Sequence, residues 1–280
     1  MSTAPDLDTV RHQVEQLVRA GDTAQLRLIR DRVREHTDRV ALAKRAAQFG
    51  TDPVGWVAGR LGQGVWSKQA EIMRSVRDHR RTAVRACHGI GKSHVASLIA
   101  CWWRDTHPPG EAFVVTTAPT FAQVRAILWR YIRKHQRTGH LPGRTNQTEW
   151  FIGEELVAFG RKPSDHDESA FQGIHARYVL VIIDEACGVP EQLWIAADAL
   201  TTNADCRILA IGNPDNPASH FRKVCAPGGG WQVIGVSAFD SPNLSGEEVP
   251  EATALALVGR EWVEEKATEW GEDNPLYRSK

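Results

Sequence analysis

The stretch from Arg85 to Ser93 reads Arg-Ala-Cys-His-Gly-Ile-Gly-Lys-Ser and carries the clearest chemistry of this chain. It follows a short apolar run typical of a strand and precedes a run typical of a helix. A glycine-rich turn between strand and helix directs backbone N–H groups at one point, where the helix N-terminus adds about half a positive charge. Lys92 would reach the β- and γ-phosphates, and the Ser93 hydroxyl would ligate Mg²⁺. The pattern predicts a nucleoside-triphosphate site.

One position departs from the phosphate-loop pattern G-x-x-x-x-G-K-[ST], because Ala86 stands where the first glycine is expected. A dinucleotide fingerprint is excluded, since Gly89 and Gly91 are not followed by a third glycine. The residues expected to contact the nucleotide in this loop are Ala86, Cys87, His88, Gly89, Ile90, Gly91, Lys92 and Ser93.

A second element completes the predicted site. Residues 178–183 form an unbroken apolar run, typical of a strand buried on both faces of a parallel sheet, and two carboxylates follow it directly. Ligands of open α/β sheets bind at the carboxyl ends of such strands. We expect Asp184 to hold Mg²⁺ together with Ser93, and Glu185 to polarise a water for attack on the γ-phosphate. The upstream loop disfavours the alternative that these acids only cap the next helix. The sequence therefore predicts a Mg²⁺-dependent ATPase.

Three further residues are expected to contact the nucleotide. Trp66 could stack on adenine, and the Gln69 amide could bond both the donor and the acceptor edge of that base. The alternative is a tryptophan at a helix start beside a surface glutamine. Asn213 follows the apolar run 207–212 and is expected to sense the γ-phosphate, although an ordinary turn residue remains an alternative.

Basic residues offer other candidate contacts. Arg161 and Arg177 are both candidates to place charge near the γ-phosphate, and the sequence does not choose between them. A predicted helix carries a stripe of cations at helical spacing, which could follow a nucleic-acid backbone but fits a solvated face better. The stripe consists of Arg130, Arg133, Lys134 and Arg137.

The composition is that of an ordinary globular chain, with 280 residues of which 42% are hydrophobic and 24% charged. Lys+Arg equals Asp+Glu at 34 each, so no global field indicates a nucleic-acid partner, although a local patch would be enough. The five cysteines lack C-x-x-C spacing and are expected to be reduced thiols rather than disulfides or zinc ligands. We find neither a signal peptide nor an apolar run long enough to span a bilayer.

The pattern along the chain predicts three regions. Residues 1–52 are expected to be helical with a break at Gly21-Asp22, 53–240 to form the α/β core, and 241–280 to form a helical lid or linker that includes 259–270. Thr51 to Gly64 reads as a glycine-rich boundary. The expected fold is a mostly parallel sheet with helices on both faces. Its strands are predicted at 82–87, 112–117, 178–183, 206–212 and 231–236, with a strand pair at 150–152 and 155–159.

Five motifs occur in a fixed order along the chain. They are Trp-x-x-Gln at 66–69, RACHGIGKS at 85–93, TTAPT at 116–120, FQGIHARYVLVIIDEA at 171–186 and ILAIGNP at 208–214. Over roughly residues 60–280, this order resembles the ATPase domain of the large subunit of tailed-phage terminases, the motor that drives DNA into the procapsid.

The resemblance implies a RecA-like P-loop fold of the ASCE class that uses ATP and Mg²⁺. It also implies double-stranded DNA, a portal and a small terminase subunit as partners, and a ring of identical subunits on the procapsid in the host cytoplasm. No membrane partner is expected. The roles it implies are Lys92 and Ser93 at phosphate and Mg²⁺, Asp184 as the Mg²⁺ carboxylate, Glu185 as catalytic base, Asn213 as coupling residue and Gln69 as adenine reader.

The chain departs from this family in two ways. The family's loop often carries Arg or Lys in its middle, where this chain has His88, and we expect Arg85 to supply the missing charge as a catalytic residue. The family usually continues into an RNase H-like nuclease, whereas this sequence stops at 274–280, which resembles the linker to it. Either this chain is an isolated ATPase domain, or a separate or downstream polypeptide cuts the DNA. In both cases we expect no nuclease activity in this chain.

Two rival functions are less consistent with the sequence. A helicase-like DNA-dependent ATPase predicts a second RecA-like domain, for which too few residues follow position 240. A nucleotide-binding regulator without turnover is disfavoured by Lys92 and Glu185 together. Because Cys87 lies inside the loop, we also expect alkylating agents to inhibit hydrolysis and bound ATP to protect.

Overall fold

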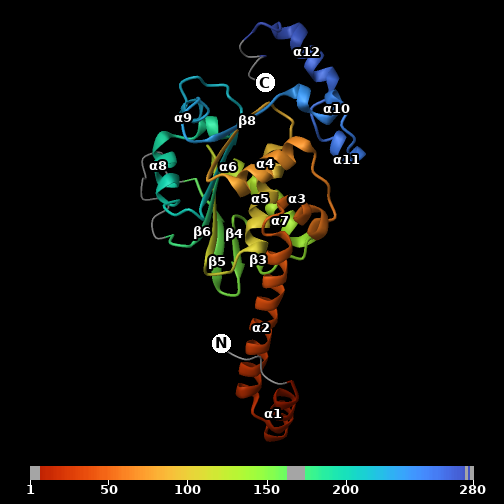
Figure 1. Ribbon diagram of the computed structural model, residues 1–280, viewed down its shortest axis with the longest axis vertical. Coiled ribbons are helices and arrows are strands. Elements are labelled where there is room, and N and C mark those ends of the chain that lie inside the picture. Colours follow the sequence, from red (N-terminus) through yellow and green to blue (C-terminus); the bar gives the residue numbers. More distant parts are fainter. Residues whose placement is uncertain (1–6, 163–173, 275–276, 278–280) are drawn as a thin grey trace.

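The computed structural model describes residues 7–162, 174–274 and 277 of the chain. Two parts of the sequence interpretation lie outside the described residues: the first three residues of the motif at 171–186, and most of the segment 274–280. Figure 1 shows a central sheet between helices, a helical arm that projects from one end, and C-terminal helices at the opposite end.

The strands agree with the sequence predictions to within one residue at each end, and only the short β3 was not expected. They are β1 Arg81–Ala86, β2 Ala112–Thr117, β3 Arg144–Thr145, β4 Glu149–Ile152, β5 Glu155–Gly160, β6 Tyr178–Asp184, β7 Arg207–Gly212 and β8 Gln232–Val236.

The helices surround this sheet and extend beyond it at both ends. Within the described residues, no helix combines the length and apolar character needed to cross a membrane. The α-helices are α1 Leu7–Ala20, α2 Thr23–Phe49, α3 Pro53–Trp56, α4 Ser67–Asp78, α5 Lys92–Thr106, α6 Phe121–Gln123, α7 Trp129–Thr138, α8 Glu191–Ala199, α9 His220–Val224, α10 Pro242–Ser245, α11 Glu251–Ala254 and α12 Arg260–Trp270. Short π-helices occupy Val57–Leu61 and Val124–Leu128, and 3-10 turns occupy Ala186–Gly188 and Ala238–Asp240.

The strands form a single sheet in the order β3-β4-β5-β2-β6-β7-β1-β8. The strands from β5 to β8 in this order all pair in parallel. Only the edge strands depart, since β4 runs antiparallel to both β3 and β5. Because β5 also pairs with β2, the predicted strand pair extends the main sheet. The expected mostly parallel α/β fold is confirmed.

Alternation along the strands divides the core into two layers. In β6, Leu180 and Ile182 pack into the cluster beneath α4, α5 and α7, whereas Val181 and Ile183 pack into the cluster beneath α8 and α9. Successive side chains of a strand point to opposite faces, so an all-apolar strand must be covered on both. Helices therefore lie on both faces, as expected.

The N-terminal region forms the projecting arm of Figure 1, in which α1 folds back against the start of α2. Gly21 adopts a left-handed φ of 69°, and the Asp22 side chain accepts a hydrogen bond from the Gln25 N–H at 3.0 Å. A residue without Cβ and an N-terminal cap thus end one helix and begin the next. The predicted helical break at Gly21-Asp22 is confirmed.

The segment 51–64, expected to be a glycine-rich boundary, is helical from Pro53 through Leu61. Asp52 caps this helix by accepting a hydrogen bond from the Gly55 N–H at 2.9 Å, and Pro53 occupies its first turn. Trp56 is fully buried in the core. Packing and a good cap therefore outweigh the low helix propensity of glycine here.

A buried carboxylate fastens the arm to the core. Asp105, near the end of α5, accepts a hydrogen bond from Trp56 Nε1 and another from Arg60 Nε, each at 2.9 Å to Oδ2. Arg45 of α2 brings Nε within 2.9 Å of Oδ1, although its N–H is directed at the Asp105 backbone carbonyl at 3.2 Å. The Asp105 side chain is fully buried, and these partners surround it.

We predict that Asp105→Asn lowers the free energy of unfolding by about 3 kcal/mol, because it leaves two arginines around a neutral buried group. Chemical denaturation monitored by circular dichroism measures this change. Asp78→Asn is the matched control, since Asp78 pairs with Arg77 on the surface and should change stability little. Equal effects of the two substitutions would contradict the structural role assigned to Asp105.

Candidate active site

The sheet order brings the predicted site residues to one edge. Strands β6, β7 and β1 are consecutive neighbours and run in parallel, so their carboxyl ends lie together. Asp184 ends β6, Asn213 follows β7, and the glycine-rich loop follows β1. Open α/β sheets bind ligands at this kind of edge.

The loop folds as a tight turn that leads into α5. Gly89 and Gly91 both have left-handed φ values, 70° and 79°, and Gly91 is the residue that precedes the helix. An L-side chain would be strained at either position. Cys87 and Ile90 turn into the core, whereas His88 is exposed. The chain therefore presents mainly loop backbone and the α5 N-terminus to this site.

Ser93 and Asp184 meet directly, as the sequence predicted. The Ser93 hydroxyl donates to Asp184 Oδ2 at 2.8 Å, and the Glu185 N–H donates to Oδ1 at 3.1 Å. Burial raises the pKa of Asp184 to about 6, while the hydrogen bond from Ser93 acts in the opposite direction. A buried carboxylate whose charge is incompletely compensated attracts a cation.

Lys92 links the loop to β7. Its Nζ donates to Asn213 Oδ1 at 2.7 Å and to the Cys87 carbonyl at 2.9 Å. Burial lowers the pKa of Lys92, and the nearby acids, Glu185 foremost, oppose this shift. Among the described residues, the Asn213 Nδ2 group is buried without a hydrogen-bond partner. The site thus holds a cation and an unused donor that could both serve an anionic ligand.

Glu185 adopts an unusual backbone conformation. Its φ of 48° is left-handed, one of two such non-glycine values among the described residues. Gly212 of β7 makes this turn possible, since a Cβ there would lie 2.8 Å from the Ala186 nitrogen. Strained residues of this kind persist where the surrounding structure fixes them and often occur at functional sites. The sequence interpretation gave Gly212 no role, because the need for glycine arises only from the contact of β7 with the turn after β6.

Gln69 and Trp66 lie close to the loop but differ in what they can contact. Gln69 is buried against Gly91, where an added Cβ would lie 2.7 Å from the Gln69 Nε2 atom. Its role in reading adenine stays a prediction. Trp66 is 1% exposed and belongs to the hydrophobic core. The prediction that Trp66 stacks on adenine is therefore not supported, since protein already covers the ring.

The structure separates the candidate arginines. Arg85 lies between Val84 and Ala86 in β1, so its side chain faces the opposite side of the sheet, near Cys225. Burial raises the pKa of the Cys225 thiol, and the charge of Arg85 opposes this shift. Arg85 also lines the cavity beside Ala86 and Cys87, so its expected role in supplying the charge missing at His88 stays a prediction. Arg177 precedes β6 and pairs with Asp205 at 3.0 Å, at the edge opposite the loop. Arg161 lies at the carboxyl end of β5, its guanidinium carbon 4.3 Å from the Phe159 ring centroid.

The predicted basic stripe lies on α7, and one of its members is bonded to another part of the chain. Arg133 donates to the Gln147 carbonyl, and its pKa is lowered by burial and by the neighbouring Arg137 and Arg125. Arg130, Lys134 and Arg137 are exposed. This arrangement is compatible with either of the two interpretations given above.

The C-terminal segment contacts the loop and the start of α4, neither of which the sequence indicated. The Val258 N–H donates to the Gly89 carbonyl at 2.8 Å. Glu247 accepts from the Ser67 N–H at 2.7 Å and from its hydroxyl at 2.6 Å, at the start of α4. Val258 and Glu247 belong to no motif of the sequence. The Val258 contact uses only backbone atoms, and Glu247 lies 180 residues from its partner Ser67.

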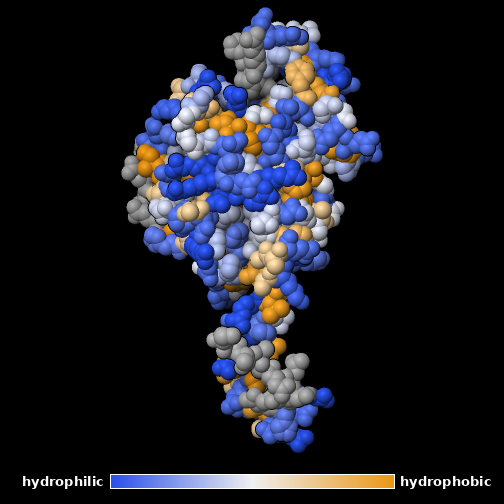
Figure 2. Space-filling view, viewed as in Figure 1, coloured by the Kyte–Doolittle hydropathy of each residue, from blue (hydrophilic) through white to orange (hydrophobic). Residues whose placement is uncertain are grey.

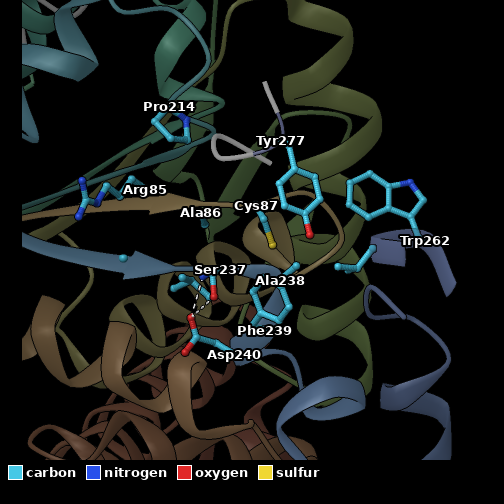
Figure 3. A pocket seen from close by; sticks show the side chains of 13 residues that line it. Arg85, Ala86, Cys87, Pro214, Ser237, Ala238, Phe239, Asp240, Trp262 and Tyr277 are labelled. Carbon is cyan, nitrogen blue, oxygen red and sulfur yellow. Dashed lines mark hydrogen bonds between the residues drawn. The ribbon is translucent and has the colours of Figure 1, made fainter. Parts of the chain in front are cut away.

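A cavity of about 550 Å³ adjoins the start of the loop. Figure 3 shows Cys87, Phe239, Trp262 and Tyr277 around it. Its wall after β8 is ordered by Asp240, which accepts hydrogen bonds from the Ser237 N–H and hydroxyl at 2.7 and 2.9 Å. Concave apolar sites of this size can enclose part of a small ligand.

The donor set suits a hard cation bound with its own waters. Within the described residues, no group of three or more His, Cys, Asp or Glu side chains could hold a metal. One hydroxyl and one carboxylate, as offered by Ser93 and Asp184, match Mg²⁺, which takes one or two protein oxygens and completes its shell with water and phosphate. The residues therefore fit Mg²⁺ better than zinc or calcium.

Comparisons with known proteins agree with the predicted resemblance. No family model matches the chain. It is 29% identical over 248 residues to the probable terminase large subunit of Enterobacteria phage P7, a match that covers 80% of this chain and 47% of that protein. The chain thus spans about half the length of this curated relative.

Solved structures show the same fold. The large terminase ATPase domain of Thermus phage P74-26 matches with a TM-score of 0.53 and 17% identity, over 79% of this chain and 94% of that one. The large terminase of the thermophilic bacteriophage D6E in complex with ADP matches with a TM-score of 0.56 and 14% identity, over 76% of this chain and 52% of that one. The resemblance to phage large terminase subunits is confirmed.

The structure overturns the expectation that Cys87 is readily alkylated. Its side chain is 3% exposed, and burial raises the pKa of the thiol to about 12. Because the thiolate is the nucleophile, we predict that iodoacetamide near neutral pH modifies the partly exposed Cys187 well before Cys87. Peptide mass spectrometry over a time course measures the order, with denatured protein as the control in which all sites react. Rapid labelling of native Cys87 would contradict this prediction.

Proposed function

We propose that this chain, which resembles phage large terminase subunits in sequence and their ATPase domains in fold, hydrolyses ATP to drive double-stranded viral DNA into a procapsid. The observation that carries the proposal is the meeting of the phosphate loop with β6, through the contact of 2.8 Å between Ser93 and Asp184. Around it lie a buried lysine, a strained glutamate and a buried asparagine, all at one edge of the sheet.

In the proposed reaction, the loop backbone and the α5 N-terminus bind the phosphates of ATP. Lys92 leaves its contacts with Asn213 and the Cys87 carbonyl and turns to the β- and γ-phosphates, where its charge stabilises the transition state. The cavity beside Cys87 and Trp262 has room for the nucleoside part. Gln69 does not line this cavity, so it could read the base only if the base lay nearer Gly91.

Glu185 orients and polarises the attacking water, as the proposed general base. The left-handed turn holds its backbone at the carboxyl end of β6, and Gly212 lets that turn lie against β7. Asn213 carries a free donor beside Lys92, so loss of the γ-phosphate would alter both partners of the Lys92–Asn213 contact. We propose that this change is passed to the loop after β7.

Mg²⁺ is the proposed cofactor. Ser93 and Asp184 would hold it, and it would neutralise charge on the β- and γ-phosphates. The raised pKa of Asp184 supports this assignment, because a bound divalent cation would favour the ionised carboxylate.

The division at about residues 52 and 240 is retained as part of the proposal, with 1–52 as an arm, 53–240 as the ATPase core and 241–280 as a lid. The contact between Val258 and Gly89 supports a lid that responds to the phosphate loop. Proposed partners are double-stranded DNA, a portal, a small terminase subunit and neighbouring copies in a ring. The proposed location is the host cytoplasm.

We predict that Glu185→Gln lowers ATP turnover by roughly 10²–10⁴-fold while ATP still binds, because the amide cannot accept the proton from water. Steady-state phosphate release measures turnover, and a fluorescent ATP analogue measures binding. Glu154→Gln is the matched control, an exposed glutamate in the β4–β5 turn that should leave turnover unchanged.

The same assay with and without duplex DNA tests the motor. DNA-stimulated turnover without strand separation supports the proposed function. Stimulation coupled to unwinding would indicate a helicase-like ATPase instead, and tight binding without turnover, in wild type as in Glu185→Gln, would indicate a nucleotide-binding regulator.

We predict that Asn213→Ala lowers turnover by about tenfold or more, because Lys92 loses a hydrogen bond of 2.7 Å and the phosphate loses a candidate donor. A drop in kcat that exceeds the change in ATP affinity is expected, since the residue is proposed to act after binding. Asn203→Ala, in the exposed loop before β7, is the control. Wild-type kinetics in Asn213→Ala would remove it from the mechanism.

A further inference from the structure

The projecting arm carries an exposed apolar stripe that the ATP site does not use. Helix α2 leaves the core and extends away from it, so much of its length has no neighbour in Figure 1. Residues 31–40 are all exposed, and Val33 and Val40 keep 48% and 41% of their surface accessible. Figure 2 shows hydrophobic residues interrupting the hydrophilic surface of this arm. A continuous exposed apolar stripe of this kind is a candidate interaction surface.

The spacing of the stripe is that of a coiled coil. Its members follow one another at intervals of three and four residues, which places them along one side of the helix. We call this stripe the arm seam; it consists of Val33, His36, Val40, Ala43 and Ala47, all exposed. The same register continues backward to Leu26 and Ile29, which are partly buried where α1 contacts α2. α1 thus covers the beginning of the register and leaves about 22 Å of it open.

The core lies on the other side of α2. Phe49 is buried, and its carbonyl accepts a hydrogen bond from Trp102 Nε1 at 2.9 Å. Arg45 and Ala46 are partly buried, and Arg45 reaches Asp105. The residues that face the core and those of the arm seam therefore lie on opposite sides of α2. Within residues 7–162 and 174–274, no other element covers the seam from Val33 to Ala47, whose members are all exposed.

Charge along the arm seam selects the kind of partner. Helix α2 holds seven Lys or Arg and three Asp or Glu residues. In the coiled-coil register, the charged residues that flank the seam are all cations: Arg30, Arg32, Arg39 and Lys44. The three acids, Asp31, Glu35 and Asp38, fall on the remaining positions, and Asp31 pairs with Arg30 at 2.9 Å. The rim of the seam is therefore basic.

A second copy of α2 does not fit this rim. In both parallel and antiparallel pairs, the flanking positions of one helix face those of the other, so cation would meet cation. Nucleic acid would meet the cations but would leave the apolar residues between them without a partner. An amphipathic helix with acidic flanks satisfies both features, since its apolar ridge covers Val33 and Val40 while its carboxylates face Arg32 and Arg39.

We propose that the arm seam of α2 docks an acidic amphipathic helix of another protein in a short coiled coil. The interaction is independent of the ATP site and tethers that partner to the end of the molecule remote from the C-terminal helices, as the arm's position in Figure 1 indicates. Apolar contact would supply affinity, and the basic rim would select the partner and its register.

A synthetic helix of about three heptads, with Leu at the core positions and Glu at the flanking ones, is the probe. A second peptide carries Lys in place of each Glu. Fluorescence anisotropy with the full chain measures binding at low and high salt. We expect the acidic peptide to bind and the basic one to bind at least about tenfold more weakly, with the difference reduced by salt.

Variants of the chain test the surface. Val33→Asp with Val40→Asp should weaken binding by about 100-fold, because two apolar contacts are lost. Arg32→Glu with Arg39→Glu should weaken binding of the acidic peptide and strengthen binding of the basic peptide, each by about tenfold. The matched control is Arg27→Glu with Arg34→Glu, the same charge change away from the seam, which should preserve the preference for the acidic peptide. Helix content and thermal midpoint confirm that each variant folds.

Several outcomes would overturn the proposal. Binding of both peptides alike, or an equal response to the flank and control reversals, would deny the seam its selectivity. Self-association of the chain alone that Val33→Asp with Val40→Asp abolishes would identify a second copy as the occupant. If the acidic peptide does not bind, but duplex DNA binds and Arg32→Glu with Arg39→Glu abolishes that binding, the occupant is nucleic acid instead.

Discussion

The site depends on one constraint, namely that the helix after β1 and the carboxyl end of β6 must meet although β7 lies between their strands. A hydrogen bond of 2.8 Å from Ser93 to Asp184 closes this arrangement. It requires three parallel strands in register, so that loop, carboxylate and Asn213 reach the same edge. A parallel sheet buried on both faces fixes that register, because a slip by one residue would turn every apolar side chain to the wrong layer.

Several polar groups in this site are in unfavourable states that a bound ligand would relieve. Burial lowers the pKa of Lys92 and raises that of Asp184, so both charged forms are disfavoured without a partner. Asn213 keeps a buried donor unused, and Glu185 keeps a strained backbone. A bound triphosphate with its cation would relieve the first three of these conditions. Stability given up in this way at a functional site is common in enzymes.

The molecule also connects its distant parts to that edge. Helix α5 begins at the phosphate loop, and its last turn contains Asp105, which holds the arm through Arg45. The C-terminal segment reaches the loop through Val258, and the start of α4 through Glu247. The arm is therefore attached to the C-terminal end of α5, and the lid is attached to the loop at its N-terminal end. Such connections allow a change at the nucleotide to reach both ends of the molecule.

The sequence by itself determined the strands, the loop, the pairing of Ser93 with Asp184 and the position of Asn213, because these depend on local apolar runs and on turn residues that follow them directly. Tertiary structure alone decided which face each remaining side chain occupies. Alternation put Arg85 on the opposite side of the sheet from Val84 and Ala86, and packing buried Trp66 and Cys87. The close contact of β7 with the turn after β6 made Gly212 necessary. It also revealed Val258 as a backbone partner of Gly89. These features arise from distant residues brought into contact, and no local pattern in a single chain records them.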